Sequence, residues 1–267
     1  MRPLPRRVYV MVAIVVCGAL AAFAASVALA PWQPRLVTWL MAGEIAIAVI
    51  ASLLVPVPLA TRSMQYVNTT GFLLATVLLP TPLAMVEVAL IWVATDCVRR
   101  VDWTESGRIP AVQTAFNAAQ VALRVAMGSL VFRAVSGAPL VTGALSDRVL
   151  FAVLAAGLAM FATDHLLVHG IVSVQAGRWR LHGLIRLARV NALPDGSLMF
   201  LGVLGAIIAG RAPLAIAVPL AFTVVIHREL ASARGDTPVD LLSEEPTPDT
   251  RTARGGVPLS AMFWWSA

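Results

Sequence analysis

Residues 8–30 read VYVMVAIVVCGALAAFAASVALA, a run without a single charged side chain. Arg2, Arg6 and Arg7 precede it. A secretory signal peptide is the competing interpretation, because residues 28–30 are small-residue rich. The run is longer than a typical signal-peptide core of roughly 7–15 residues, and further apolar runs follow. The stretch therefore predicts a first transmembrane helix.

The composition of the whole chain also indicates a membrane protein. Of 267 residues, 59% are hydrophobic and 13% are charged, about half the charged share of an ordinary soluble domain. A soluble fold of this size needs a polar surface that these residues are too few to make. The composition therefore excludes a soluble globule, a disordered chain and a collagen, and favours a helical membrane protein.

Proline and charged segments divide the rest of the chain into further apolar runs. The predicted fold is an all-α, polytopic membrane helix bundle of about eight short spans. Residues 71–97 count as two spans because Pro80 and Pro82 interrupt them, and proline inside a helix costs about 3 kcal/mol. The predicted spans cover residues 8–30, 36–55, the two halves of 71–97, 109–132, 149–174, 198–210 and 212–226.

Arginine placement predicts the orientation. The net charge is +6 and every basic residue apart from histidine is arginine. With eight spans and a cytoplasmic N-terminus, twelve arginines before residue 231 fall on the cytoplasmic side and four on the outer side. The positive-inside rule favours this arrangement, with both termini in the cytoplasm. Because the arginines lie in short loops, they indicate topology and lipid contact, and no nucleic-acid partner is predicted.

The predicted bundle occupies residues 1–230, and it includes a basic amphipathic helix at residues 178–190. Leu181, Leu184 and Ile185 recur there at helical spacing, with arginines on the other face. Such a helix lies on the membrane surface. The predicted interfacial residues are Arg178, Trp179, Arg180, Arg186 and Arg189. Residues 231–267 are rich in proline, threonine, acidic residues and glycine, which predicts a disordered cytoplasmic tail.

Four polar side chains share one face of the span at 109–132. Gln113, Asn117, Gln120 and Arg124 follow one another at steps of four, three and four residues. That face is expected to point into the bundle or a wet cavity. Hydrogen bonding between helices, at about 0.6 kcal/mol per contact, explains such a face as well as a functional site does. Arg124 favours the functional interpretation, since interhelical hydrogen bonding does not need a full charge.

Three acidic residues are candidate partners of Arg124, namely Glu44, Glu87 and Asp164. In the eight-span arrangement Glu44, Glu87 and Arg124 fall at similar depth, so a pair or triad among these three is the preferred arrangement. It is either a structural ion pair or a polar pocket for a small ligand or a proton. Together with the face described above, these acids complete the predicted pocket.

Asp164, His165 and His169 raise the question of a metal. Two histidines and one aspartate on one helix do not form a recognised metal-binding pattern, and no His-Glu-x-x-His motif is present. Neither a metal nor another cofactor is predicted.

Several segments resemble one bacterial family. They are residues 71–100, which form a helix–proline–helix pattern ending in Arg99 and Arg100, residues 116–120 (FNAAQ), residues 161–168 (FATDHLLV) and residues 191–228. Together they are similar to the N-terminal membrane domain of actinobacterial and Chloroflexi-type signalling proteins that carry a diguanylate cyclase (GGDEF) or HD-type phosphohydrolase domain. The family usually has asparagine where this chain has Asp164.

The resemblance covers residues 36–228 and implies a membrane-embedded input domain. The chain departs from the family after Arg228, because residues 231–267 contain no GGDEF loop and no HD motif. No family catalytic residue has a counterpart here, so no enzymatic activity is predicted for this chain.

Two functions remain open on the sequence. The first is a sensory or anchoring input module of a bacterial signalling protein, located in the plasma (inner) membrane. The second is a small-molecule uptake component, similar to the substrate-binding subunits of energy-coupling-factor transporters. An intramembrane enzyme has no nucleophile–base or metal pair to support it. The predicted partners are the lipid bilayer, a small-molecule ligand and a second copy of the chain.

Overall fold

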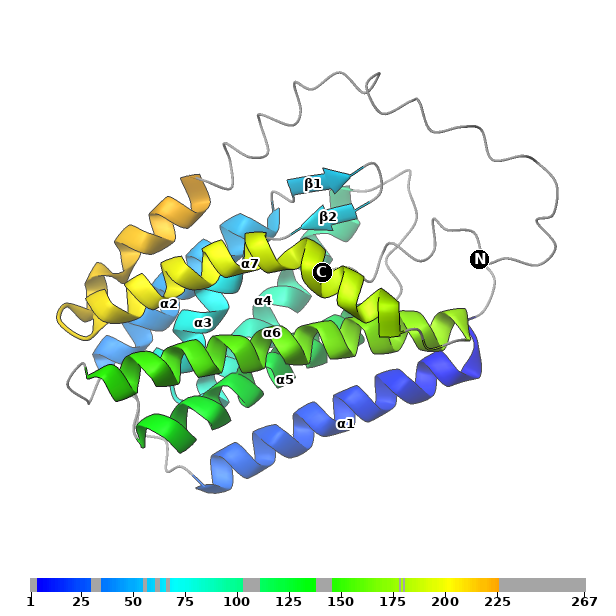
Figure 1. The fold of residues 1–267 in the computed structure, drawn as a ribbon, viewed down its shortest axis with the longest axis horizontal. Coiled ribbons are helices and arrows are strands. Elements are labelled where there is room, and N and C mark those ends of the chain that lie inside the picture. The colour runs from blue at the N-terminus through cyan, green and yellow to red at the C-terminus, as the bar shows by residue number, and fades with distance from the viewer. Residues whose placement is uncertain are drawn as a thin grey trace, which may run out of the picture.

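The computed structural model describes residues 4–29, 35–54, 57–60, 63–65, 68–102, 111–137, 146–177, 179 and 181–225. The predicted tail at residues 231–267 lies outside these ranges, as do Arg178 and Arg180. In the described ranges the chain forms a bundle of long helices with one short β-hairpin beside it (Figure 1). The predicted all-α bundle is confirmed there, with the hairpin as an addition.

The helices follow the apolar runs closely. In chain order they are α1 (Arg6–Leu29), α2 (Leu36–Leu54), α3 (Thr69–Leu78), α4 (Thr81–Asp102), α5 (Ala111–Ser136), α6 (Asp147–Ala176) and α7 (Leu181–Ala209), followed by a short apolar helix over Pro213–Val225. The hairpin strands are β1 (Val57–Ala60) and β2 (Ser63–Gln65), which pair antiparallel. Each predicted span therefore has a helical counterpart.

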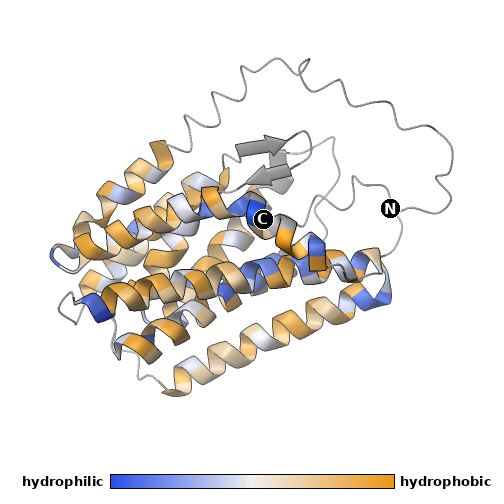
Figure 2. Ribbon diagram, viewed as in Figure 1, coloured by the Kyte–Doolittle hydropathy of each residue, from blue (hydrophilic) through white to orange (hydrophobic). Residues whose placement is uncertain are grey.

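In the described ranges, six helices are long and apolar enough to cross a membrane. They also expose large apolar side chains, as Ile14, Ile47, Leu90, Leu158 and Phe200 illustrate. Figure 2 shows hydrophobic residues along most of the length of these helices. A monomeric soluble protein rarely exposes apolar surface on this scale. The architecture is that of a helical membrane protein.

The break between α3 and α4 has a local cause. Leu79 adopts an extended conformation, with φ −96° and ψ 153°, directly before Pro80. The proline ring disfavours helical geometry at the residue before it, so α3 ends there. Pro82 falls in the first turn of α4, where its missing N–H is tolerated. The predicted separation into two helices is confirmed.

Helix α3 is the centre of the bundle. All ten of its residues are buried, and it contacts α2, α4, α5, α6 and α7. Figure 1 shows it lying among these helices, whereas α1 lies along one edge. Because α3 is enclosed by protein, its short length is not set by the thickness of the bilayer.

Helix α7 differs from the prediction. Residues 178–190 were expected to form a separate amphipathic helix ahead of a span beginning at residue 198, but α7 is continuous from Leu181 to Ala209. Contacts with α3 hold α7 across the intervening Pro-Asp-Gly sequence: Thr69 donates a hydrogen bond to Asp195, and Thr70 donates to the carbonyl of Leu198 at 2.8 Å. Tertiary contact thus overrides a sequence typical of a turn.

Both ends of α6 are capped. The Ser146 side chain accepts a hydrogen bond from the backbone N–H of Val149, and Gly177 closes the helix in the left-handed conformation at φ 74°. Arg7 at the start of α1 reaches this C-terminus, where its Nη2 donates to the carbonyl of Gln175 at 3.2 Å. A cation at a helix C-terminus is favourable, so this contact joins α1 to α6.

Replacing Gly177 with alanine is expected to destabilise the protein by about 1 kcal/mol or more, because an L-residue is strained at positive φ. The new Cβ would also lie 2.7 Å from the Arg7 guanidinium. Thermal unfolding in detergent measures the effect. The matched control is Gly196→Ala in α7, where a Cβ meets nothing within 4 Å. Equal melting temperatures for the two variants would contradict the role given to Gly177.

Candidate functional site

The polar face of α5 points into the bundle. Gln113, Asn117, Gln120 and Arg124 are all buried, as the spacing of these residues predicts. Gln120 is fully buried and Arg124 is 5% exposed. Leu130, on another side of the helix, is exposed. The predicted orientation of this face is confirmed.

Arg124 pairs with Asp164 of α6. Its Nη1 lies 3.3 Å from Asp164 Oδ1, and Gln120 Nε2 donates to the same oxygen at 2.9 Å. The aromatic ring of Phe72 in α3 lies 5.6 Å from the guanidinium carbon, a cation–π distance. Two donors from α5 therefore converge on one carboxylate oxygen of α6.

Arg124 is also connected to α7 through a hydroxyl group. Its Nη2 donates to Thr69 Oγ1 at 3.1 Å, and the same hydroxyl donates to Asp195 Oδ1 at 3.2 Å. Asp195 is 8% exposed. One guanidinium thus contacts α3 and α6 directly and reaches α7 through Thr69. We call Thr69, Gln120, Arg124, Asp164 and Asp195 the Arg124 cluster.

A second polar contact joins α6 to α7 close by. His165 Nδ1 lies 2.8 Å from the carbonyl oxygen of Phe161, and His165 Nε2 lies 3.3 Å from Asn191 Nδ2. A carbonyl accepts and an amide nitrogen donates, so these partners fit the tautomer with its proton on Nδ1. His165 thereby fixes the start of the membrane-crossing part of α7 next to the Arg124 cluster.

Three buried polar atoms on α5 have no hydrogen-bond partner among the described residues. They are Asn117 Oδ1, Gln120 Oε1 and Arg124 Nε. Buried polar atoms in native proteins are usually paired with protein or ordered water. Two unpaired acceptors and one unpaired donor on one helix face mark the place where a water molecule, an ion or a ligand would be stabilised.

The predicted pairing of Arg124 with Glu44 or Glu87 is wrong. Among the described residues, the ion pair of Arg124 is with Asp164. Glu44 and Glu87 are only partly buried, and within the described part of the chain Glu44 Oε2 and both carboxylate oxygens of Glu87 have no hydrogen-bond partner. Similar depth in the membrane did not decide the pairing, because α5 packs most extensively against α6 and so presents Arg124 to Asp164.

Gln113 lies one helical turn from Asn117, near a second buried contact between α4 and α5. There Thr114 Oγ1 donates to Asp96 Oδ2 at 2.9 Å. Of the predicted pocket, the structure therefore brings together Gln120, Arg124 and Asp164, places Asn117 and Gln113 further along the same face, and leaves Glu44 and Glu87 apart from the Arg124 pair.

Thr69, Asp195 and Asn191 were not among the predicted site residues. Asp195 stands in the sequence Leu-Pro-Asp-Gly, which is typical of a turn, so it was placed outside the membrane. Its one distinguishing signal was position, since it lies three residues before an apolar run. No group of three or more His, Cys, Asp or Glu side chains in the described ranges is arranged to hold a metal ion.

The predicted interfacial residues are described only in part. Trp179 is 58% exposed and Arg189 is exposed, whereas the side chain of Arg186 lies outside the described part of the structure. Trp179 stacks edge-to-face on His169 at 4.7 Å between ring centroids. The aromatic ring therefore packs on the end of α6.

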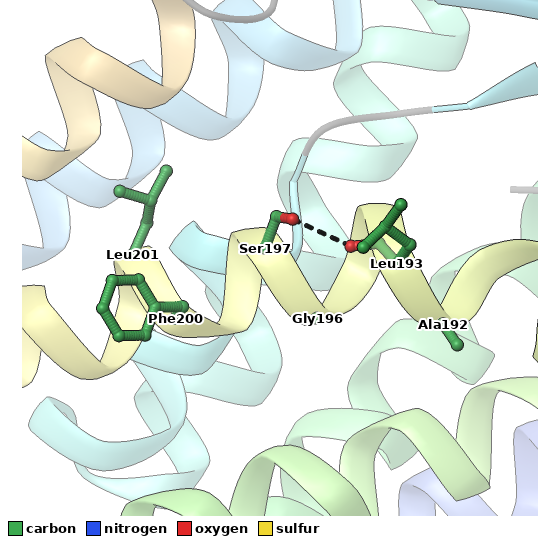
Figure 3. Close-up of a pocket in the computed structure, with 6 residues that line it drawn as sticks. All are labelled: Ala192, Leu193, Gly196, Ser197, Phe200 and Leu201. Atoms are coloured by element: carbon green, nitrogen blue, oxygen red, sulfur yellow. Dashed lines mark hydrogen bonds between the residues drawn. The ribbon is translucent and has the colours of Figure 1, made fainter.

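A shallow groove follows the outer side of α7 (Figure 3). Its lining is mainly apolar, and Ser197 donates its hydroxyl hydrogen bond to the carbonyl of Leu193 in its own helix at 2.9 Å. The lining residues are Ala192, Leu193, Gly196, Ser197, Phe200 and Leu201. None of the described lining residues is charged, so the groove suits contact with acyl chains better than recognition of a polar ligand.

The chain matches no protein-family model, no curated protein and no solved structure. The Arg124 cluster and the fold around it are therefore the basis for a functional proposal.

Proposed function

We propose that this chain is a sensory input module of a bacterial signalling protein, embedded in the plasma membrane, in which the Arg124 cluster controls the position of α7. The observation that supports the proposal is that one guanidinium is connected to three other helices. Arg124 contacts Asp164 in α6 and Thr69 in α3, and through Thr69 it reaches Asp195 in α7. A change in charge at this point alters contacts among four helices at once.

The packing beyond the cluster supports transmission to the last helix. A Cβ on Gly205 of α7 would lie 3.0 Å from Leu74 of α3 and 3.3 Å from Pro219 of the helix Pro213–Val225. The three helices therefore meet closely at Gly205. Packed interfaces of this kind shift between discrete arrangements, so movement of α7 would be passed to Pro213–Val225. That helix is the last described segment before residue 226.

The proposed topology has eight membrane segments and cytoplasmic termini. It places Arg99, Arg100 and Arg108 on the same side as Arg2, Arg6 and Arg7, in keeping with the positive-inside rule. In this arrangement α3 and Pro213–Val225, at 10 and 13 residues, are short segments that complete the bundle. The signal would then leave the membrane on the cytoplasmic side.

Electron-spin distance measurements test the proposal. Both exposed cysteines, Cys17 and Cys97, are replaced by serine. Spin labels are then attached to cysteines introduced at two exposed positions, Leu158 of α6 and Phe222 of the helix Pro213–Val225. In lipid vesicles, Asp195→Asn is expected to shift the Leu158–Phe222 distance distribution by about 2 Å or more, the scale of interface helix shifts. Unchanged distances would refute the coupling.

The matched control is Asp147→Asn. Asp147 is exposed at the first turn of α6, so the substitution makes the same change of charge outside the cluster. It is expected to leave the distance distribution unaltered. A shift of equal size in the control would show that the movement does not originate at the Arg124 cluster.

A further inference from the structure

The Arg124 cluster has unequal numbers of positive and negative groups. Asp164 and Asp195 each carry one negative charge when ionised, and Arg124 supplies one positive charge. Among the described residues, the titratable and charged groups around Asp195 are Arg124 of α5 and Asp164 and His165 of α6, while α3 contributes the Thr69 hydroxyl. An unpaired buried charge is strongly unfavourable in a protein interior. A single additional positive charge would balance the two carboxylates.

The described residues also provide an oxygen acceptor that no other group bonds. Gln120 is fully buried, its Nε2 is held by Asp164 Oδ1, and its Oε1 has no partner among the described residues. The carboxamide therefore contacts Asp164 through its nitrogen, and its oxygen remains available as an acceptor. Carboxylate oxygens bind protons, and both carboxylate and carbonyl oxygens bind hard metal cations.

The site is not fully enclosed by protein. The Asp164 side chain retains 11% of its accessible surface, while the Arg124 side chain retains 6%. A small part of the Asp164 side chain is therefore not covered by other residues.

We propose that the Arg124 cluster binds one monovalent cation, a proton or Na⁺, at the carboxylates of Asp164 and Asp195. This inference rests on the proposed function and names the stimulus that the cluster would detect. The surplus of one charge fits a monovalent cation better than a divalent one. A cation on Asp195 competes with the hydrogen bond from Thr69, so occupancy would loosen α7 from α3.

The test is the dependence of thermal stability on each cation. The full chain in lipid nanodiscs is titrated with NaCl at constant ionic strength, using choline as the replacement ion, and separately with acid in choline alone. A cation that binds only the folded state raises the Tm, by about 5 °C at a hundredfold excess over Kd. A rise in Tm with added Na⁺ identifies Na⁺ as the bound cation, and a rise in Tm with falling pH in choline identifies the proton. Either result supports the site.

The decisive variant is Asp195→Asn, which removes the surplus negative charge. In this variant the cation-dependent rise in Tm is expected to be almost lost. In the exposed-site control Asp147→Asn the rise is expected to equal that of the native chain. Equal responses in the native chain and Asp195→Asn would overturn the proposal, and so would the absence of any response in the native chain.

A second variant provides the test if Asp195→Asn does not fold. Thr69→Val is nearly isosteric and removes the hydroxyl that binds Asp195 Oδ1. It is expected to move the midpoint of the cation response by about tenfold, the effect of a hydrogen bond to a charged group. An unmoved midpoint would contradict the site. A Tm response to the cation without a change in the Leu158–Phe222 distance would support this inference and refute the proposed function. A change in that distance without a Tm response would support the proposed function and refute this inference.

Discussion

Replacing Arg124 with methionine is expected to destabilise the folded bundle by about 3–5 kcal/mol, the cost of breaking a buried ion pair from one side. The substitution leaves Asp164 without its cationic partner and removes the donor to Thr69. The loss of a guanidinium that contacts two helices should also loosen α5 from α3 and α6. Thermal unfolding followed by size-exclusion chromatography in detergent measures both the stability and the monodispersity of the variant.

The double variant Arg124→Met with Asp164→Leu distinguishes charge from shape. Replacing both members of a buried ion pair with apolar residues of similar volume is often neutral or stabilising. The double variant should therefore recover most of the stability that the single variant loses. Arg211→Met, at an exposed arginine after α7, is the control for loss of one positive charge. If Arg124→Met melts like Arg211→Met, the ion pair is not a stability determinant.

Replacing Gly128 with valine is also expected to destabilise the bundle. Gly128 lies where α5 crosses α3 and α6, and a Cβ there would approach Met160 Cγ at 2.6 Å and Thr76 Cγ2 at 2.8 Å. Overpacking by extra methyl groups costs about 1–3 kcal/mol, occasionally more. Thr76 cannot turn away freely, because its hydroxyl is bonded to the carbonyl of Phe72 at 2.7 Å. The expected result is a fall in Tm of several degrees.

Gly43→Val is the matched comparison. Gly43 lies in α2, where a Cβ meets nothing within 4 Å. The same change of residue there adds apolar surface at an open helix position and is expected to be close to neutral in stability. A Gly128 variant as stable as the Gly43 variant would mean that α5 and α6 do not pack as closely as described.

The helices were predictable because their signals are local. An uninterrupted apolar run defines most of α1, and an apolar run with one acidic residue, Glu44, defines α2. Pro80 restricts the backbone of Leu79 enough to end α3. The spacing of Gln113, Asn117, Gln120 and Arg124 also determines which side of α5 is buried. Each of these features depends on residues within a few turns of one another.

The partners within the site were not predictable in the same way. Several carboxylates lie at depths that Arg124 could reach, and the choice among them depends on which helix α5 packs against and how each helix is rotated. Asp195 was missed for a related reason, because its Pro-Asp-Gly context indicates a turn unless α3 is already in place to hold the helix. Non-local packing decides both outcomes.

The enclosure of α3 has a consequence for the order in which this protein is assembled. Thr70 of α3 donates to the carbonyl of Leu198, a partner 128 positions further along the chain. As the ribosome delivers the chain to the bilayer, α3 emerges before α4, α5, α6 and α7, all of which contact it. We expect α3 to wait at the translocon or in a provisional position until α7 has been synthesised, which makes its insertion a late step in the biogenesis of the bundle.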